Sequence, residues 1–211
     1  MDLLLQLPIL LFSIIFHEVA HGWMALRHGD DTAARLGRLT FNPVAHIDPV
    51  GTVLLPLVCF AFHWPLFGWA KPVPVDPYSF HRPRKGIVQV AAAGPASNLI
   101  LCVAAAILLR ILLGLPPAAA GSMGTLRSAL WFALHINLVL AFFNLIPVHP
   151  LDGSKVLGGL LPLRWAMAYE RHEPYGVAII LGLIFLGVIR YLVAIPSNIF
   201  LLLLGKALGM A

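Results

Sequence analysis

The chain has 211 residues, of which 60% are hydrophobic and only 11% are charged. Soluble domains carry about a quarter charged residues, so this composition excludes a soluble protein and indicates an integral membrane protein. The formal net charge of +5 reports on membrane topology, and we expect a lipid bilayer around the chain and no nucleic-acid partner. We expect residues 1–211 to form a single domain.

The first apolar run, residues 3–26, is long enough to cross a hydrocarbon core of about 30 Å as a helix. It is too long for the apolar region of a signal peptide, so we expect no cleaved leader. The run contains His17, Glu18 and His21 in the pattern H-E-x-x-H. Because positions i and i+4 share a helix face, both imidazoles can bind one metal ion.

This pattern is typical of zinc hydrolases, in which two histidines bind the ion and the glutamate acts as general base on its water. Ionisable side chains inside a membrane helix are costly, which favours a functional role. We therefore predict one zinc ion per chain, bound by His17 and His21, with Glu18 as general base. The alternative is that neighbouring helices satisfy these polar side chains without a metal.

Residues 52–68 are apolar but are interrupted by Pro56 and Pro65. The run is marginal for a complete span and favours a re-entrant hairpin. On either side, Arg38–Phe41 and Trp69–Val75 are candidate strands of a small membrane-associated β-sheet, against which an extended substrate could lie. Two prolines in the second segment restrict it to a sheet edge or an extended loop.

Further spanning helices are predicted at residues 86–113, 126–147 and 175–193, whereas the apolar tail 196–208 is too short to assign. The first of these contains Asn98 in the stretch GPASN, and this side chain needs a hydrogen-bond partner in hydrocarbon. The predicted fold is an all-α polytopic membrane protein with about four to six transmembrane helices and a re-entrant hairpin.

The distribution of basic residues predicts the topology. Ten of the fourteen Lys and Arg residues fall in residues 27–50, 69–85 and 148–174, and residues 114–125 contain none. The positive-inside rule places the three basic segments in the cytosol, which requires residues 52–68 to return to the side from which they enter. We expect a bacterial inner-membrane protein with its site toward the cytosolic side.

A catalytic zinc ion has three protein ligands and one open position, so the two histidines need a third partner. Asp152 follows the 126–147 helix and should lie at the same membrane depth as the histidines. An alternative role for Asp152 is the N-cap of a helix over residues 153–160. His149 is a competing candidate for the third ligand.

The motifs HEVAHGW (17–23), GPASN (94–98) and NLIPVHPLDGSKVL (144–157) together resemble those of the site-2 protease family of intramembrane zinc metalloproteases. The closest likeness is to short bacterial members without PDZ or CBS domains. This resemblance implies that His17, His21 and Asp152 bind zinc and that Asn144 lies near the scissile bond. It further implies that the substrates are transmembrane proteins or peptides, cut within or near the bilayer.

Two features depart from the family pattern: the chain begins with the H-E-x-x-H helix, and His149 stands where a small or apolar residue is more usual. Asn144 could donate a hydrogen bond to a substrate carbonyl, or it could instead join two helices. Two other functions remain open, a non-proteolytic zinc-binding membrane protein of the same fold and a transporter or proton channel. The concentration of polar residues at one depth, without an internal repeat, argues against the transporter.

Overall fold

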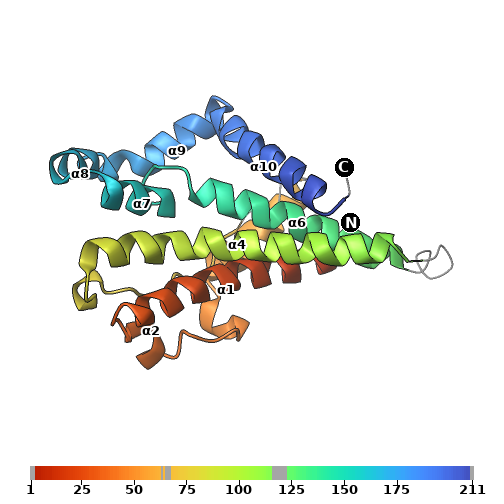
Figure 1. The fold of residues 1–211 in the computed structure, drawn as a ribbon, viewed down its shortest axis with the longest axis horizontal. Coiled ribbons are helices and arrows are strands. Elements are labelled where there is room, and N and C mark those ends of the chain that lie inside the picture. The colour runs from red at the N-terminus through yellow and green to blue at the C-terminus, as the bar shows by residue number, and fades with distance from the viewer. Residues whose placement is uncertain (1–2, 63, 65–67, 116–122, 210–211) are drawn as a thin grey trace.

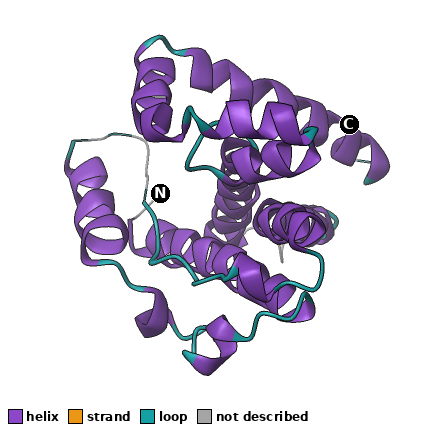
Figure 2. Ribbon diagram, turned by 90° about the vertical axis from the view of Figure 1, so that its left-hand side faces the viewer, coloured by secondary structure: helices purple, strands orange, loops and turns teal. Residues whose placement is uncertain are grey.

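The computed structural model describes residues 3–62, 64, 68–115 and 123–209, and the regular elements in these residues are all helices (Figure 2). Within these residues, four helices are long and apolar enough to cross a membrane. They are α1 (Leu3–Arg27), α4 (Pro83–Leu113), α6 (Gly124–Asn144) and α10 (Val188–Ala207). The prediction of an all-α polytopic membrane protein is confirmed.

Shorter helices connect these four. They are α2 (Thr32–Arg35), η1 (Pro43–His46), η2 (Pro49–Leu54), α3 (Leu55–Ala61), η3 (Pro77–Ser79), α7 (Asp152–Leu160), α8 (Leu163–Glu170), η5 (Glu173–Tyr175) and α9 (Gly176–Phe185).

Helix α4 is the centre of the fold, because it packs against both α1 and α6 (Figure 1). Its contact with α6 is built from small and aliphatic residues, with Cys102 and Ala106 buried against Leu134 and Leu138. Small side chains allow membrane helices to approach closely, where dispersion contacts rather than water exclusion hold them together. Helix α10 covers the outer side of this contact through Phe200 and neighbouring leucines.

The segment predicted as a re-entrant hairpin returns to the point where it begins. Trp69 N donates to Gly51 O at 3.1 Å, and Thr52 Oγ1 donates to Trp69 O at 2.8 Å. Helices η2 and α3 are continuous over Pro49–Ala61, and this stretch rises at most about 20 Å, short of a hydrocarbon core of about 30 Å. The two ends of the segment therefore lie together, as a hairpin requires, although residues 63 and 65–67 of this loop lie outside the described residues.

The predicted small β-sheet does not form: Arg38–Phe41 and Trp69–Val75 are both irregular. Pro72 and Pro74 have no N–H to donate to a ladder. The two segments are instead joined by a side chain, because Arg38 Nη2 donates to the carbonyl of Lys71 at 2.7 Å. A hydrogen bond from a side chain to the backbone thus joins the two segments, in place of the backbone hydrogen bonds of the predicted sheet.

The C-terminal helices also differ from the prediction. The span expected at 175–193 is broken, since α9 ends at Phe185 and α10 begins at Val188. Gly187 lies between them with φ +69°, a left-handed conformation that glycine adopts without a steric penalty. The fourth long helix therefore includes the tail that the sequence left unassigned.

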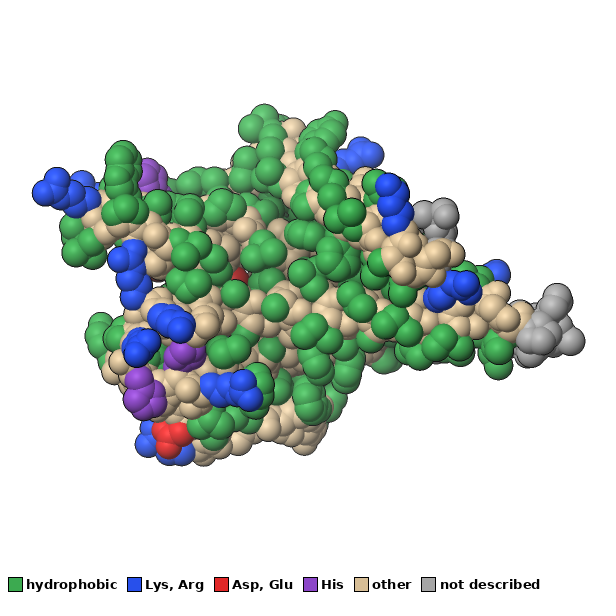
Figure 3. All heavy atoms as spheres, viewed as in Figure 1, with side chains coloured by type: hydrophobic (Ala, Val, Ile, Leu, Met, Phe, Trp, Pro, Cys, Tyr) green, Lys and Arg blue, Asp and Glu red, His purple; other side chains and the backbone are tan. Residues whose placement is uncertain are grey.

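The three basic segments meet at one end of the long helices. His81 N donates to His28 O at 2.9 Å, and Arg84 Nε donates to Gly159 O at 2.7 Å, so residues 27–50, 69–85 and 148–174 are directly linked. Figure 3 shows most of the charged and histidine side chains of this face at the same end, beside a broad hydrophobic surface over the long helices. This arrangement fits a membrane protein with one strongly basic end.

Candidate active site and metal centre

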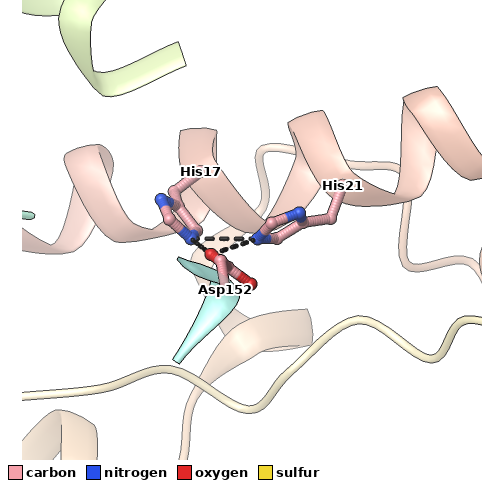
Figure 4. Close-up of side chains that lie close together, drawn as sticks. All are labelled: His17, His21 and Asp152. Carbon is pink, nitrogen blue, oxygen red and sulfur yellow. Dashed lines mark hydrogen bonds and ion pairs between the residues drawn. The ribbon is translucent and has the colours of Figure 1, made fainter. Parts of the chain in front are cut away.

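His17 and His21 lie one turn apart on α1 and point toward Asp152, which is 135 positions away from His17 (Figure 4). The two Nε2 atoms are 3.0 Å apart, and each lies 3.1 Å from Asp152 Oδ2. All three residues are less than 10% exposed. The structure thus brings together the three residues predicted to bind zinc.

Hydrogen bonds to the far side of each ring orient the imidazoles. His17 Nδ1 donates to Asn98 Oδ1 at 2.6 Å, and His21 Nδ1 donates to the carbonyl of Val90 at 2.7 Å. When Nδ1 carries the proton, Nε2 of the neutral ring presents its lone pair. This is the arrangement found around metal-binding histidines, whose second nitrogen is held by a carbonyl or carboxylate.

The donor set fits a zinc ion. Two imidazole nitrogens and one carboxylate oxygen form a typical catalytic zinc set, and ligand atoms on a tetrahedral ion lie about 3.3 Å apart. The observed separations of 3.0 to 3.1 Å between the three ligand atoms are close to this value. His17, His21 and Asp152 could therefore hold zinc after only a small expansion of the cluster.

Asp152 is the first residue of α7, but its side chain does not cap that helix. Its carboxylate instead faces the two histidines, which disfavours the alternative role as an N-cap. Gly153 permits this position, since a Cβ atom there would overlap the backbone carbonyl of Leu145.

Gly94 brings α4 against the same cluster. A Cβ atom on Gly94 would overlap the Nε2 atoms of both His17 and His21. The GPASN stretch therefore contributes twice to the site, first through the missing side chain of Gly94 and one turn later through the amide of Asn98. No larger residue fits at position 94 without displacing the imidazoles.

Glu18 lies beside the histidines and accepts a hydrogen bond from Val73 N at 2.7 Å. A cavity of about 350 Å³ opens there, lined by the three clustered residues together with Glu18, Val73 and Asn144. Its size is within the range of small-ligand sites. Asn144 Nδ2 donates to Leu140 O of its own helix at 2.9 Å, and among the described residues this amide has no hydrogen bond to a second helix.

His149 is placed apart from the cluster of Asp152 and the two histidines. Its Nδ1 lies 3.2 Å from Ser154 Oγ, and its Nε2 faces Glu170 at 3.9 Å. The geometry therefore does not favour His149 over Asp152 as the third ligand of the cluster.

Several groups at the site have no role in the sequence-based prediction. Asn98 stands out in the sequence as a polar residue in an apolar run, yet its partners are not predictable: it also donates to Ser13 O at 3.2 Å and to Asn137 Oδ1 at 2.8 Å. The only sequence signal for this network is that Ser13, Asn98 and Asn137 are each a polar residue in a predicted membrane span. The backbone groups of Val73 and Val90 carry no sequence signal at all.

Comparisons with known proteins found a matching family and related sequences. The model of "Peptidase family M50" matches residues 111–187. The chain is 40% identical over 177 residues to the "Putative zinc metalloprotease YwhC" of Bacillus subtilis, covering 82% of this chain and 77% of that protein. It is 29% identical over 178 residues to the "Putative zinc metalloprotease Rip2" of Mycolicibacterium smegmatis, covering 82% of this chain and 64% of that protein.

A Mycobacterium tuberculosis protein of the same Rip2 name is 29% identical over 154 residues, which cover 70% of this chain and 53% of that protein. No solved structure matches the chain. Extended similarity to the Bacillus protein, together with the family model, identifies this protein as a metallopeptidase of the membrane. The chain therefore belongs to peptidase family M50, the site-2 protease family, and its cofactor is zinc.

Proposed function

We propose that this protein hydrolyses peptide bonds in or near the transmembrane segments of membrane-protein substrates, as in regulated intramembrane proteolysis. One observation carries the proposal. His17, His21, Asp152 and Glu18 all line one cavity, and His17, Glu18 and His21 belong to a helix long and apolar enough to cross a membrane. We also propose that residues 1–211 form a single intramembrane metalloprotease domain.

His17, His21 and Asp152 would hold the zinc ion, and Asn98 and Val90 would keep the two imidazoles in the binding orientation. When bound, zinc polarises the scissile carbonyl and makes water a stronger acid.

Glu18 is the general base that takes the proton from water and passes it to the leaving amine. The N–H of Val73 holds Oε2 of this carboxylate, so the other oxygen accepts the proton.

Asn144 and the segment around Val73 would position the substrate. Both line the cavity that contains Glu18. Asn144 uses one N–H for the carbonyl of Leu140, and its second N–H can donate to a substrate carbonyl. A helical substrate has its carbonyls engaged in backbone hydrogen bonds, so it must unwind before a peptide bond reaches this position.

The basic end of the molecule supports the proposed orientation. Residues 27–50, 69–85 and 148–174 hold most of the Lys and Arg residues and meet at one end of the long helices. The positive-inside rule then places this end, and the site near it, toward the cytosol of a bacterial inner membrane.

The test is cleavage by wild-type protein and by Glu18→Gln. A set of epitope-tagged single-span membrane proteins is coexpressed with each form, and fragments are followed by immunoblotting. The glutamine side chain can still accept the hydrogen bond from Val73, but it cannot take up a proton. Because general base catalysis contributes about 10²- to 10⁴-fold, we expect cleavage to fall by that factor while the zinc content stays unchanged.

Asp31→Asn is a matched control, because it makes the same acid-to-amide change at an exposed residue that pairs with Arg35. It should cleave like the wild type. Near-wild-type cleavage by a zinc-loaded Glu18→Gln variant would remove Glu18 from the mechanism. Zinc in both proteins with cleavage in neither would favour the non-proteolytic zinc protein, and substrate flux without cleavage would favour the transporter.

A further inference from the structure

His149 belongs to a second cluster of potential metal ligands, separate from the one formed by His17, His21 and Asp152. One ligand atom from each of His149, Glu170 and Glu173 lies within 4.8 Å of the others. The three residues come from the loop before α7, the end of α8 and the start of η5. Neither the proposed protease mechanism nor family membership gives this cluster a role.

The imidazole of His149 is buried, with only 9% of the residue exposed, and its Nε2 has no hydrogen-bond partner among the described residues. Leaving a buried polar atom without a partner costs about 1–3 kcal/mol, so such an atom calls for an explanation. Glu170 Oε2 lies 3.9 Å from it, too far for a hydrogen bond. A separation of 3.9 Å instead suits a metal ion bound by both His149 Nε2 and Glu170 Oε2.

Ser154 sets the tautomer of this ring. Its hydroxyl donates to Leu151 O at 2.7 Å, so the oxygen lone pair faces His149 Nδ1 at 3.2 Å and accepts its proton. In the neutral ring, Nε2 then carries a lone pair directed toward the two glutamates. A hydrogen bond between Nε2 and a carboxylate would need a proton that this tautomer does not have, whereas a metal ion needs that lone pair.

The acidic partners are free to complete such a site. Neither Glu170 nor Glu173 forms an ion pair with Lys or Arg in the part of the chain that the structure describes. Both residues are exposed, so their carboxylates can move toward the buried imidazole at little cost. The donor set of one nitrogen and two carboxylates suits Zn²⁺ or a similar first-row ion, whereas Mg²⁺ and Ca²⁺ prefer sites made of oxygen alone.

We propose that His149, Glu170 and Glu173 form a second divalent-cation site of the Zn²⁺ class. Binding there tethers α8 and η5 to the loop that, three residues later, supplies Asp152 to the first cluster. The proposal does not depend on whether the protein cleaves peptide bonds. It gives a role to the histidine that departs from the family pattern.

The test is the stoichiometry of metal binding by the full chain, purified in detergent and stripped with a chelator. The protein is dialysed to equilibrium against Zn²⁺ and its metal content is measured by elemental analysis. Co²⁺ is used in parallel, because its visible absorption reports the ligands of each ion. We expect two equivalents for the wild type and one for both His149→Gln and the double variant Glu170→Gln/Glu173→Gln.

His172→Gln is the matched control, since His172 lies beside Glu173 but is exposed and outside the cluster. It should keep both equivalents. Asp152→Asn should lose the other equivalent and keep this one, which separates the second site from the first. The two glutamates are at the surface, so their variant should fold, and its remaining equivalent verifies this.

A single equivalent in the wild type would overturn the proposal. So would a second equivalent that persists in the double glutamate variant. A second equivalent lost in that variant but kept in His149→Gln would show surface binding by carboxylates alone and would equally refute the site.

Discussion

Asn98 links the candidate zinc site to the packing of the membrane helices, so its replacement should affect both. The residue is fully buried; its Oδ1 accepts the proton of His17 Nδ1 at 2.6 Å, and its Nδ2 donates to Ser13 O and Asn137 Oδ1. Asn98→Ala removes all three hydrogen bonds. It leaves the Nδ1 group of His17 and the Oδ1 atom of Asn137 without these partners.

The effect on zinc should come from the lost orientation of His17. Losing the partner that holds a metal-binding histidine typically costs 10- to 100-fold in metal affinity, which is about 1.4 to 2.7 kcal/mol. The effect on folding is separate. Each buried group left unpaired costs about 1–3 kcal/mol, so the thermal stability of Asn98→Ala should also fall.

Zinc affinity is measured by chelator competition with detergent-purified protein, and stability by thermal unfolding of the metal-free form. Asn98→Asp separates the two effects, because its carboxylate still accepts from His17 but cannot donate to Asn137. We expect its zinc affinity to remain closer to the wild type than that of Asn98→Ala. A zinc affinity of Asn98→Ala equal to that of the wild type would refute the proposed role.

Ser97→Ala is the control for loss of a buried polar group on the same helix. Ser97 Oγ donates to Gly94 O at 2.6 Å and, among the described residues, forms no hydrogen bond with His17. Its removal should leave zinc affinity within about twofold of the wild type, since the orientation of both imidazoles is kept. A large loss in this control would mean that any disturbance of α4 weakens the site.

Three further predictions follow from the structure. Asp152→Asn should lower zinc affinity strongly while the fold persists, measured by the same competition; unchanged affinity would exclude Asp152 as a ligand. Single cysteines at Ser79 and Thr125, in a background without native cysteine, should be labelled from opposite sides of the membrane, and labelling from one side would contradict the topology. Asp30 accepts hydrogen bonds from Thr32 N and Asp76 N, so Asp30→Asn should lower the free energy of unfolding by about 1.5 to 3 kcal/mol.

The last of these has a defined pH dependence. Burial would raise the pKa of the Asp30 carboxyl, but hydrogen bonds from Thr32 and the backbone of Asp76 outweigh it and lower that pKa. The stabilisation is therefore complete above the unfolded-state pKa of about 3.9 and is lost as the pH falls toward the folded value. Thermal unfolding measured between pH 3 and pH 7 should show this loss of stability in the wild type and a smaller loss in Asp30→Asn.

The sequence by itself determines the features that depend on neighbours along the chain. Apolar length identifies α1, α4 and α6, because a helix that satisfies its own backbone is stable in hydrocarbon. Helical periodicity alone predicts that His17 and His21 share a face. Apolar length is a less reliable guide at the C-terminal end, where Gly187 interrupts a run of apolar residues that was predicted to be one helix.

The tertiary structure alone decides which distant groups meet. Asp152 reaches His17 across 135 positions, Asn98 orients that ring from α4, and Val73 holds Glu18 from a loop. It also decides against the predicted strands, because Arg38 and Glu18 take the backbone groups that a sheet would pair. The position of the two imidazoles also depends on the close approach of α4 at Gly94, and the packing of two helices is a property that neither segment carries in its own sequence.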